Sequence, residues 1–171
     1  TSTSLTTSAI GDVDVDETDG ITLTNLVSFN GSITVDAAGT ITALNVVSTK
    51  DAAANDVSLT TTSGDIAVTT ITAGALGDVT LSAAGAITDD GSAGTLITGD
   101  VLTATAGGAI TVDTTVSSAN LTTSAAGDVD VDETDGLILE GVTATGNLDV
   151  VASGSITQSG AIDVDGTASF S

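Results

Sequence analysis

The stretch Leu-Thr-Thr-Ser-Ala-Ile-Gly-Asp-Val-Asp-Val-Asp-Glu-Thr-Asp-Gly, from Leu5 to Gly20, decides how the rest of the chain is interpreted. It returns at Leu121–Gly136 with a single change, because Ala126 stands where the first copy has Ile10. The two copies start 116 residues apart (121 − 5). Self-similarity at a fixed period is the signature of a repeat architecture.

The long repeat also predicts the domain organisation. We expect residues 5–120 to form a first long repeat and residues 121–171 to form the start of a second. Both are expected to lie within a single solenoid segment that spans residues 1–171. The chain starts without Met and carries no signal peptide or anchor, so we expect it to be a piece of a longer secreted protein.

The composition narrows the possible chemistry. The 171 residues include no Cys, Met, Trp, Tyr, Pro or His, and Lys50 is the one cation against 23 acidic residues. A formal charge of −22 repels nucleic acid and anionic membrane surfaces, so we expect neither nucleic-acid binding nor membrane insertion. Abundant Val, Ile, Leu and Thr favour strands, and without cysteines the stability must come from packing.

A short phrase recurs within the long repeat: a turn pair, an apolar-x-apolar triplet, a small-residue turn with Gly, and a second triplet. One instance is Gly77-Asp-Val-Thr-Leu-Ser-Ala-Ala-Gly-Ala-Ile87-Thr. Successive phrases begin 28, 24, 22, 22, 20 and 27 residues apart, and the first five gaps sum to 116, so one long repeat holds five short ones. The first apolar residues of the phrases are Leu5, Ile33, Val57, Val79, Val101, Leu121 and Leu148.

These phrases predict an all-β fold, a parallel β-helix or solenoid of about seven coils with roughly 22 residues per coil. The outer side chains of each triplet point inward and the middle one points to solvent. Gly, Asn and Asp fit the corners. A tandem of β-sandwiches is the alternative, but its strands have different environments and do not explain nearly constant phrases.

The sequence Gly-Asp/Asn/Ser, Val/Leu/Ile-x-Leu/Val, Ala-x-Gly-x-Ile-Thr resembles the repeats of filamentous-haemagglutinin-type exoproteins and related giant bacterial surface adhesins. The resemblance covers Leu5 to about Val164. It implies a right-handed β-helical shaft that is exported and displayed on the cell surface. The secretion-domain signatures of that family and any toxin-like tail are missing, so the resemblance is to the shaft.

The acidic part of the long repeat is a candidate metal site. Asp12, Asp14 and Asp16 alternate with valines, which on a strand places the carboxylates on the outer face. Neighbouring carboxylates repel each other, and calcium binds six to eight oxygen ligands. The candidate ligands are Asp12, Asp14, Asp16, Glu17, Asp19, Asp128, Asp130, Asp132, Glu133 and Asp135. The alternative is a solvated acidic face that keeps a long fibre soluble and blocks lateral association.

Known calcium motifs do not fit these copies. Counted from Asp12, position six is Glu17 and position twelve is Leu23, which excludes the helix-loop-helix calcium loop. The calcium-binding nonapeptide roll is excluded too, because Gly107-Gly108 does not repeat. The density of carboxylates alone suggests calcium, which is the only cofactor that the sequence suggests.

Catalysis finds little support. Asp89-Asp90 is the nearest approach to a catalytic carboxylate pair, and a polar turn before Gly91 explains it. Without His, Tyr, Trp, Arg or Cys, the usual general bases and sugar-stacking groups are lacking, so we expect a protein that is not an enzyme. Phe29 and Phe170 are expected to fill the core.

Two structural functions follow, and a third remains open. The first is a shaft segment of a secreted bacterial cell-surface adhesin or extracellular fibre, whose ligand binds other regions. The second is a protomer of a self-assembling extracellular filament that stacks end to end through exposed β-helix edges. In both, neighbouring repeats or identical subunits are the partners. A module that binds a specific glycan or receptor has no support in the sequence but stays open.

Overall fold

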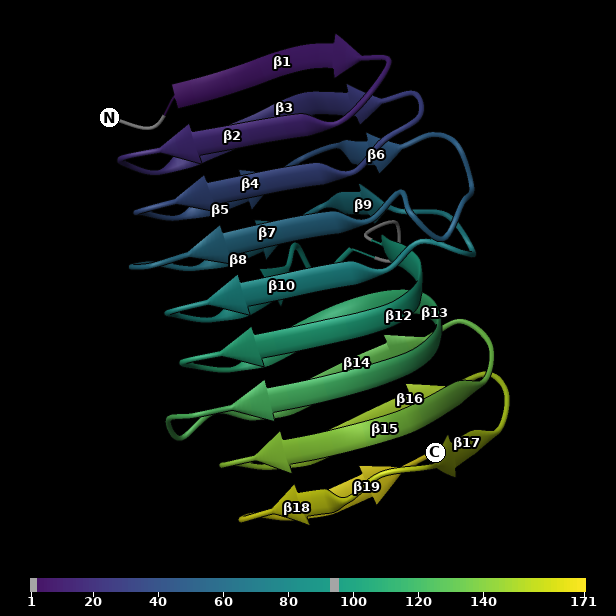
Figure 1. Cartoon of the computed structure of the whole chain (residues 1–171). Helices are drawn as coiled ribbons and strands as arrows, with labels where there is room; N and C mark the ends of the chain where they lie inside the picture. Colours follow the sequence, from purple (N-terminus) through teal and green to yellow (C-terminus); the bar gives the residue numbers. More distant parts are fainter. Residues whose placement is uncertain (1–2, 93–95) are drawn as a thin grey trace.

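The protein is a parallel β-solenoid, as the computed structural model shows for residues 3–92 and 96–171 (Figure 1). Every regular element in these residues is a strand, and all pairings between strands are parallel. The coil makes about 8 turns, with bridged residues about 20 apart. The predicted all-β solenoid is thus confirmed. No helix in the described ranges is long and apolar enough to cross a bilayer.

Three strand positions recur in the turns, and we call them the first, second and third faces. The first face holds β2 (Val13–Glu17), β4 (Ile33–Ala37), β7 (Val57–Thr61), β10 (Val79–Ala83), the second half of β12 (Leu96–Ala106), the end of β13 (Ile110–Thr123), β15 (Leu137–Ala144) and β18 (Ile162–Val164). β17 (Ile156–Gln158) pairs with the start of β15.

The second and third faces share several strands. The second face holds the first halves of β1 (Thr3–Ala9) and β3 (Ile21–Ser28), then β5 (Ile41–Ala43), β8 (Ile66–Val68), β11 (Ile87–Asp89), the start of β13, β14 (Val129–Glu133), β16 (Leu148–Ala152) and β19 (Ala168–Phe170). The third face holds the second halves of β1 and β3, then β6 (Val46–Ser48), β9 (Thr70–Thr72), the first half of β12 and the middle of β13.

The coil is right-handed. In Figure 1 the chain descends from the N-terminus to the C-terminus, the near strands β4, β7 and β10 run from right to left, and the fainter strands β3, β6 and β9 behind them run from left to right. This sense of travel matches the hand expected from the family resemblance and from the general preference of parallel crossover connections.

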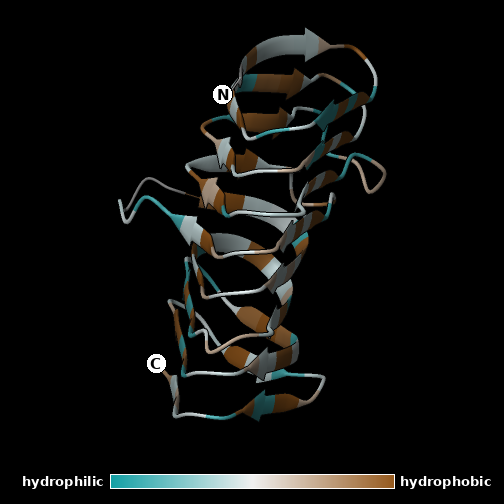
Figure 2. Ribbon diagram, turned by 90° about the vertical axis from the view of Figure 1, so that its left-hand side faces the viewer, coloured by the Kyte–Doolittle hydropathy of each residue, from teal (hydrophilic) through white to brown (hydrophobic). Residues whose placement is uncertain are grey.

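The interior is filled by stacked aliphatic side chains, as the phrases predict. Alternation along each strand gives buried and solvent-facing positions in turn, which Figure 2 shows as hydrophobic bands along the ribbons. On the second face one inward column consists of Ile21, Ile41, Ile66, Ile87, Ile110, Val129 and Leu148, each at most 2% exposed.

The predicted number of seven coils was too low by about one turn. The seven phrases were each counted as one coil, but the two longest gaps exceed a turn. Leu5 pairs with Leu23 on the second face, whereas Ile33 pairs with Val13 on the first face, so the 28 residues from Leu5 to Ile33 cover more than one turn. The 27-residue gap near the C-terminus behaves in the same way. Each of these two gaps covers one turn and part of another, and the two parts together account for the eighth turn.

The two long-repeat copies lie on different faces. The first-face column runs through five pairings, Val13, Ile33, Val57, Val79, Leu102 and Ala119. Val129, the counterpart of Val13, pairs instead with Ile110 on the second face. The 116-residue repeat therefore spans five turns and roughly half of the next, so its five short phrases do not correspond to five whole turns.

Candidate functional site

The first acidic copy lies at the N-terminal end of the solenoid. Asp14 and Asp16 are exposed on β2 and alternate with Val13 and Val15, which are half-buried. The predicted outward carboxylates and inward valines are therefore confirmed. The second copy has the same alternation on β14: Asp130 and Asp132 are exposed and their neighbouring valines are buried.

The aspartate that precedes each of these strands caps the next turn. A carboxylate oxygen of Asp12 accepts a hydrogen bond from the backbone N–H of Ser32 at 2.9 Å. Asp128 accepts one from the N–H of Asn147 at 2.7 Å. Charge-assisted bonds of this kind satisfy a corner N–H that has no strand partner.

The same capping bond recurs at other corners, which explains the Gly-Asp pairs of the phrases. Other bonds of this type are Asp56 to Asp78 N–H at 3.0 Å, Asp65 to Ala86 N–H at 2.8 Å, and Asp78 to Val101 N–H at 3.2 Å. The sequence analysis treated Asp12 and Asp128 as candidate metal ligands and missed this role. The recurring Gly-Asp at strand starts was the available signal.

The glutamates of the two copies have different surroundings. Glu17 is half-buried, and its carboxylate accepts the N–H groups of Thr18 at 2.9 Å and Asp19 at 3.3 Å. Glu133 is 4% exposed. It accepts the Thr114 hydroxyl at 2.9 Å and the Val116 N–H at 3.1 Å, both from the preceding turn.

Glu133 provides hydrogen bonds at the point where the strand pairing of the third face ends. Thr114 pairs with Glu133, and the next pairing to the turn below is Ser118 with Ile138. The carboxylate of Glu133 thus takes the N–H of Val116, a hydrogen bond that a strand would otherwise provide. Burial raises the pKa of Glu133, while hydrogen bonds from Val116, Thr114 and Asp135 act in the opposite direction.

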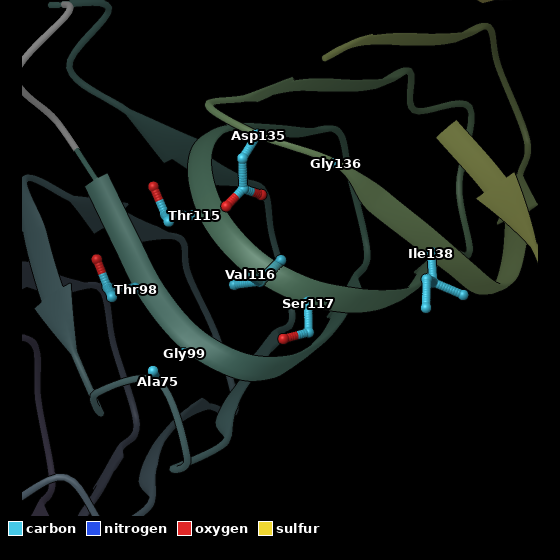
Figure 3. Close-up of a pocket in the computed structure, with 9 residues that line it drawn as sticks. All are labelled: Ala75, Thr98, Gly99, Thr115, Val116, Ser117, Asp135, Gly136 and Ile138. Atoms are coloured by element: carbon cyan, nitrogen blue, oxygen red, sulfur yellow. The ribbon is translucent and has the colours of Figure 1, made fainter. Parts of the chain in front are cut away.

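A shallow groove lies where this pairing is interrupted (Figure 3). Its volume is about 500 Å³, and its lining combines hydroxyl, aliphatic and carboxylate side chains. The lining residues are Ala75, Thr98, Gly99, Thr115, Val116, Ser117, Asp135, Gly136 and Ile138. Asp135 is the one ionisable group among them, so the groove holds no pair of acid and base.

Carboxylates stack in register on the second face. Asp113 pairs in register with Asp132, and Asp130 pairs with Asp149. Burial raises the pKa of Asp113, and repulsion from Asp89, Asp132, Asp130 and Asp90 adds to it. Burial also raises the pKa of Asp130, reinforced by Asp132, Asp149, Asp89 and Asp128.

The ten candidate calcium ligands do not converge. The two copies lie on different faces. Within each copy the carboxylates divide among solvent-facing aspartates, a corner cap and a glutamate that accepts backbone N–H groups. In residues 3–92 and 96–171, no three His, Cys, Asp or Glu side chains form a group that could hold a metal ion. Calcium binding by the acidic face remains a prediction.

Other expectations can be compared with the structure. Asp89 accepts the N–H of Gly91 at 2.9 Å and Asp90 that of Ser92 at 2.9 Å, as in a polar turn. Phe29 and Phe170 are 53% and 46% exposed, so the expectation that they fill the core was wrong. Phe29 follows the last inward position of β3 at a corner, whereas Phe170 pairs in register with the buried Val150 at the open end, where no described turn covers it.

The architecture places the chain among the parallel β-solenoid proteins built from sequence repeats. Residues 126–171 match a family model described as "Repeats of unknown function (DUF5649)". The match lies within the second long repeat. Searches of curated proteins and of solved structures returned no match.

Proposed function

We propose that this chain is a structural shaft segment of a secreted bacterial cell-surface adhesin or extracellular fibre. In this role the solenoid extends and presents other regions of the protein, and its own side chains carry out no catalysis. The parallel stack, the long sequence repeat and the resemblance to filamentous-haemagglutinin-type repeats support the proposal. Ligand binding is assigned to regions outside these turns.

The observation that carries the proposal is that each turn is buried only by the turns stacked against it. Leu5, Val13 and Val15 at one end, and Ile156 and Ile162 at the other, are only partly buried against the core. β2 pairs with β4 alone, and β19 pairs with β16 alone, within the described ranges. An outer strand edge of this kind is a template for another strand.

The second long-repeat copy indicates what covers such an end. Val129 and Val131 have the same sequence surroundings as Val13 and Val15, yet each is 1% exposed because β13 covers β14. A turn laid over β2 would bury Val13 and Val15 in the same way. More repeats of the same chain provide this turn in the shaft function.

A second candidate is a filament in which separate copies stack end to end. The same uncovered edges support it, since the C-terminal strand of one copy presents a parallel edge to the first strands of the next. The two candidates differ in whether the contact is within one chain or between chains.

Electron microscopy of the native fibre combined with intact-mass measurement tests both candidates. For the shaft we expect fibres of covalently continuous chains far larger than 16.3 kDa. Fibres that dissociate in denaturant to short units would contradict the shaft and favour the filament. Native material without fibres would contradict both.

A further inference from the structure

One edge of the solenoid carries large exposed apolar side chains at three of four successive connections. The connections from β1 to β2, β3 to β4, β6 to β7 and β9 to β10 all lie at the right-hand edge in Figure 1. Backbone bonds tie them together: Phe29 N–H to Ala9 carbonyl at 2.9 Å, and Thr49 N–H to Ser28 carbonyl at 2.8 Å. We call residues 10–12, 29–32, 49–56 and 73–78 the corner ridge.

Large apolar side chains stand out from the corner ridge. Ile10 is 82% exposed, Phe29 53% and Leu76 52%, which are the three largest values for big apolar residues in the described ranges. They occupy the first, second and fourth connections. Exposed apolar residues gathered at one edge are a candidate protein contact, whereas residues scattered singly over a surface need no explanation.

The third connection holds the only cation of the chain. Lys50 is exposed, and Asp51 beside it is exposed too. One oxygen of Asp51 accepts the N–H of Leu76 at 2.8 Å, which fixes this carboxylate against the fourth connection. The order along the ridge is therefore Phe29, then the Lys50–Asp51 pair, then Leu76, on three consecutive turns.

These side chains belong to the first long repeat alone. The positions 116 residues later hold Ala126 for Ile10, Thr145 for Phe29 and Gly166 for Lys50. The one difference within the sixteen repeated residues thus falls on the corner ridge. In the second copy these positions lie at the corner between the first and second faces, which small or polar residues form.

We propose that the corner ridge binds the corner ridge of a second copy of this chain, antiparallel, about a two-fold axis at the third connection. Two-fold symmetry makes residue i contact residue j and j contact i. Lys50 of one copy then meets Asp51 of the other, twice. Phe29 of one copy meets Leu76 of the other, because each lies one turn from the axis.

Charge complementarity indicates that the partner of the corner ridge is a second copy of this chain. The apolar–ionic–apolar order reads the same from both sides of the third connection, so the ridge is complementary to itself. Two bodies of charge −22 repel each other elsewhere on their surfaces. The contact therefore has to include Lys50, the single group that attracts a carboxylate. The pairing is lateral and independent of the shaft or filament function of the ends.

A charge-exchange experiment tests the pairing. We expect the 171-residue chain to be a dimer in sedimentation equilibrium at about 0.15 M salt, over chain concentrations from roughly 1 μM to 1 mM. Lys50→Asp and Asp51→Lys variants should each bind themselves at least about tenfold more weakly, since like charges face each other. Mixed together, they should form a heterodimer, because an acidic side chain of one variant then faces a basic side chain of the other at both contacts.

The apolar contacts are tested by substitutions borrowed from the second long repeat. Phe29→Thr, the residue found at position 145, should weaken dimerisation while the far-ultraviolet circular dichroism and thermal midpoint stay unchanged. Leu44→Thr is the control, since Leu44 is an exposed apolar residue outside the ridge. A wild-type chain that stays monomeric throughout, or variants that fail to recover when mixed, would overturn the proposal.

Discussion

Residues 5–20 and 121–136 share fifteen of sixteen side chains, yet they lie on different faces and at different depths in the solenoid. In the first copy the valines of the strand are half-buried and the glutamate bonds to its own turn. In the second copy the valines are buried and the glutamate bonds to the preceding turn. Local sequence therefore sets the alternation of side chains, and the covering turn sets what each side chain contributes.

The largest expected difference between the two copies is the stability cost of replacing the glycine that precedes each strand. A Cβ at Gly127 would lie 2.4 Å from the carbonyl oxygen of Gly108, whereas a Cβ at Gly11 meets nothing within 4 Å. We expect Gly127→Ala to lower the free energy of unfolding by about 3 kcal/mol, since the backbone of the neighbouring turn must move. Gly11→Ala is the matched control, with an expected change below about 0.5 kcal/mol. Urea unfolding followed by circular dichroism measures both.

Val131 and Val15 occupy equivalent sequence positions and differ in burial, so their substitutions should differ in cost. Val131→Ala should cost about 2 kcal/mol, because it removes two buried methyl groups and leaves a cavity between β13 and β16. Val15→Ala should cost under about 1 kcal/mol, because Val15 is only half-buried. Equal costs in the isolated chain would show that the two valines are equally covered, contrary to this account.

Glu133 and Glu17 test the hydrogen bonds that end the third face. Glu133→Ala leaves the Thr114 hydroxyl and the Val116 N–H without their acceptor in a buried setting, and we expect a loss of about 1–2 kcal/mol. In Glu17→Ala the freed N–H groups of Thr18 and Asp19 are exposed and bond to water. Hydrogen exchange should identify the affected region, with Val116 losing protection in the first variant and not in the second.

The smallest expected effect is a pH dependence that belongs to the second copy and to Asp113 on the turn before it. The pKa values of Asp113, Asp130 and Glu133 are raised in the folded state, so the folded chain binds more protons than the unfolded one. Stability should therefore rise as the pH falls from neutral through the raised folded pKa values, and level off near the ordinary values of 3.8 and 4.5.

Urea midpoints between neutral pH and about pH 4 measure this slope. Asp130→Asn should flatten it. Asp14→Asn, the counterpart in the first copy, should change it less, because Asp14 pairs in register with Thr34 and not with another aspartate. A midpoint that falls steadily with acid would contradict the stacked carboxylates of the second face.

Much of the fold could be predicted from short-range pattern. Alternation around residues such as Val35 and Leu59, with Gly-Asp corners between triplets, is a property of each phrase and needs no knowledge of its neighbours. The turn count was missed because a phrase contains two strands, and either strand can occupy the first face. The register is fixed by which turn lies above, and that information is spread over about 20 residues on each side.

The candidate site was predictable only in part, for the same reason. The outward direction of Asp14 and Asp130 follows from alternation. The interactions of these carboxylates do not follow from alternation, because they depend on the residues one turn away. These are Thr34 for Asp14, and Thr111 and Asp149 for Asp130. The burial of Glu133 could not be inferred either, because the identical local sequence leaves Glu17 half-buried.

The most direct test of the account is whether the second copy has changed face. Thr103 lies in the column that runs below Asp14 through Thr34, Ser58 and Thr80, and its partner on the following turn is Asn120. Thr111 lies on the second face and pairs in register with Asp130.

Because the chain has no cysteine, two double variants decide the question by disulfide formation under mild oxidation, read by peptide mass spectrometry. Thr111→Cys with Asp130→Cys should form the disulfide, because residues paired in register on neighbouring strands are within reach. Thr103→Cys with Asp130→Cys should remain reduced. A disulfide in the second variant and none in the first would place both copies on one face and contradict the account.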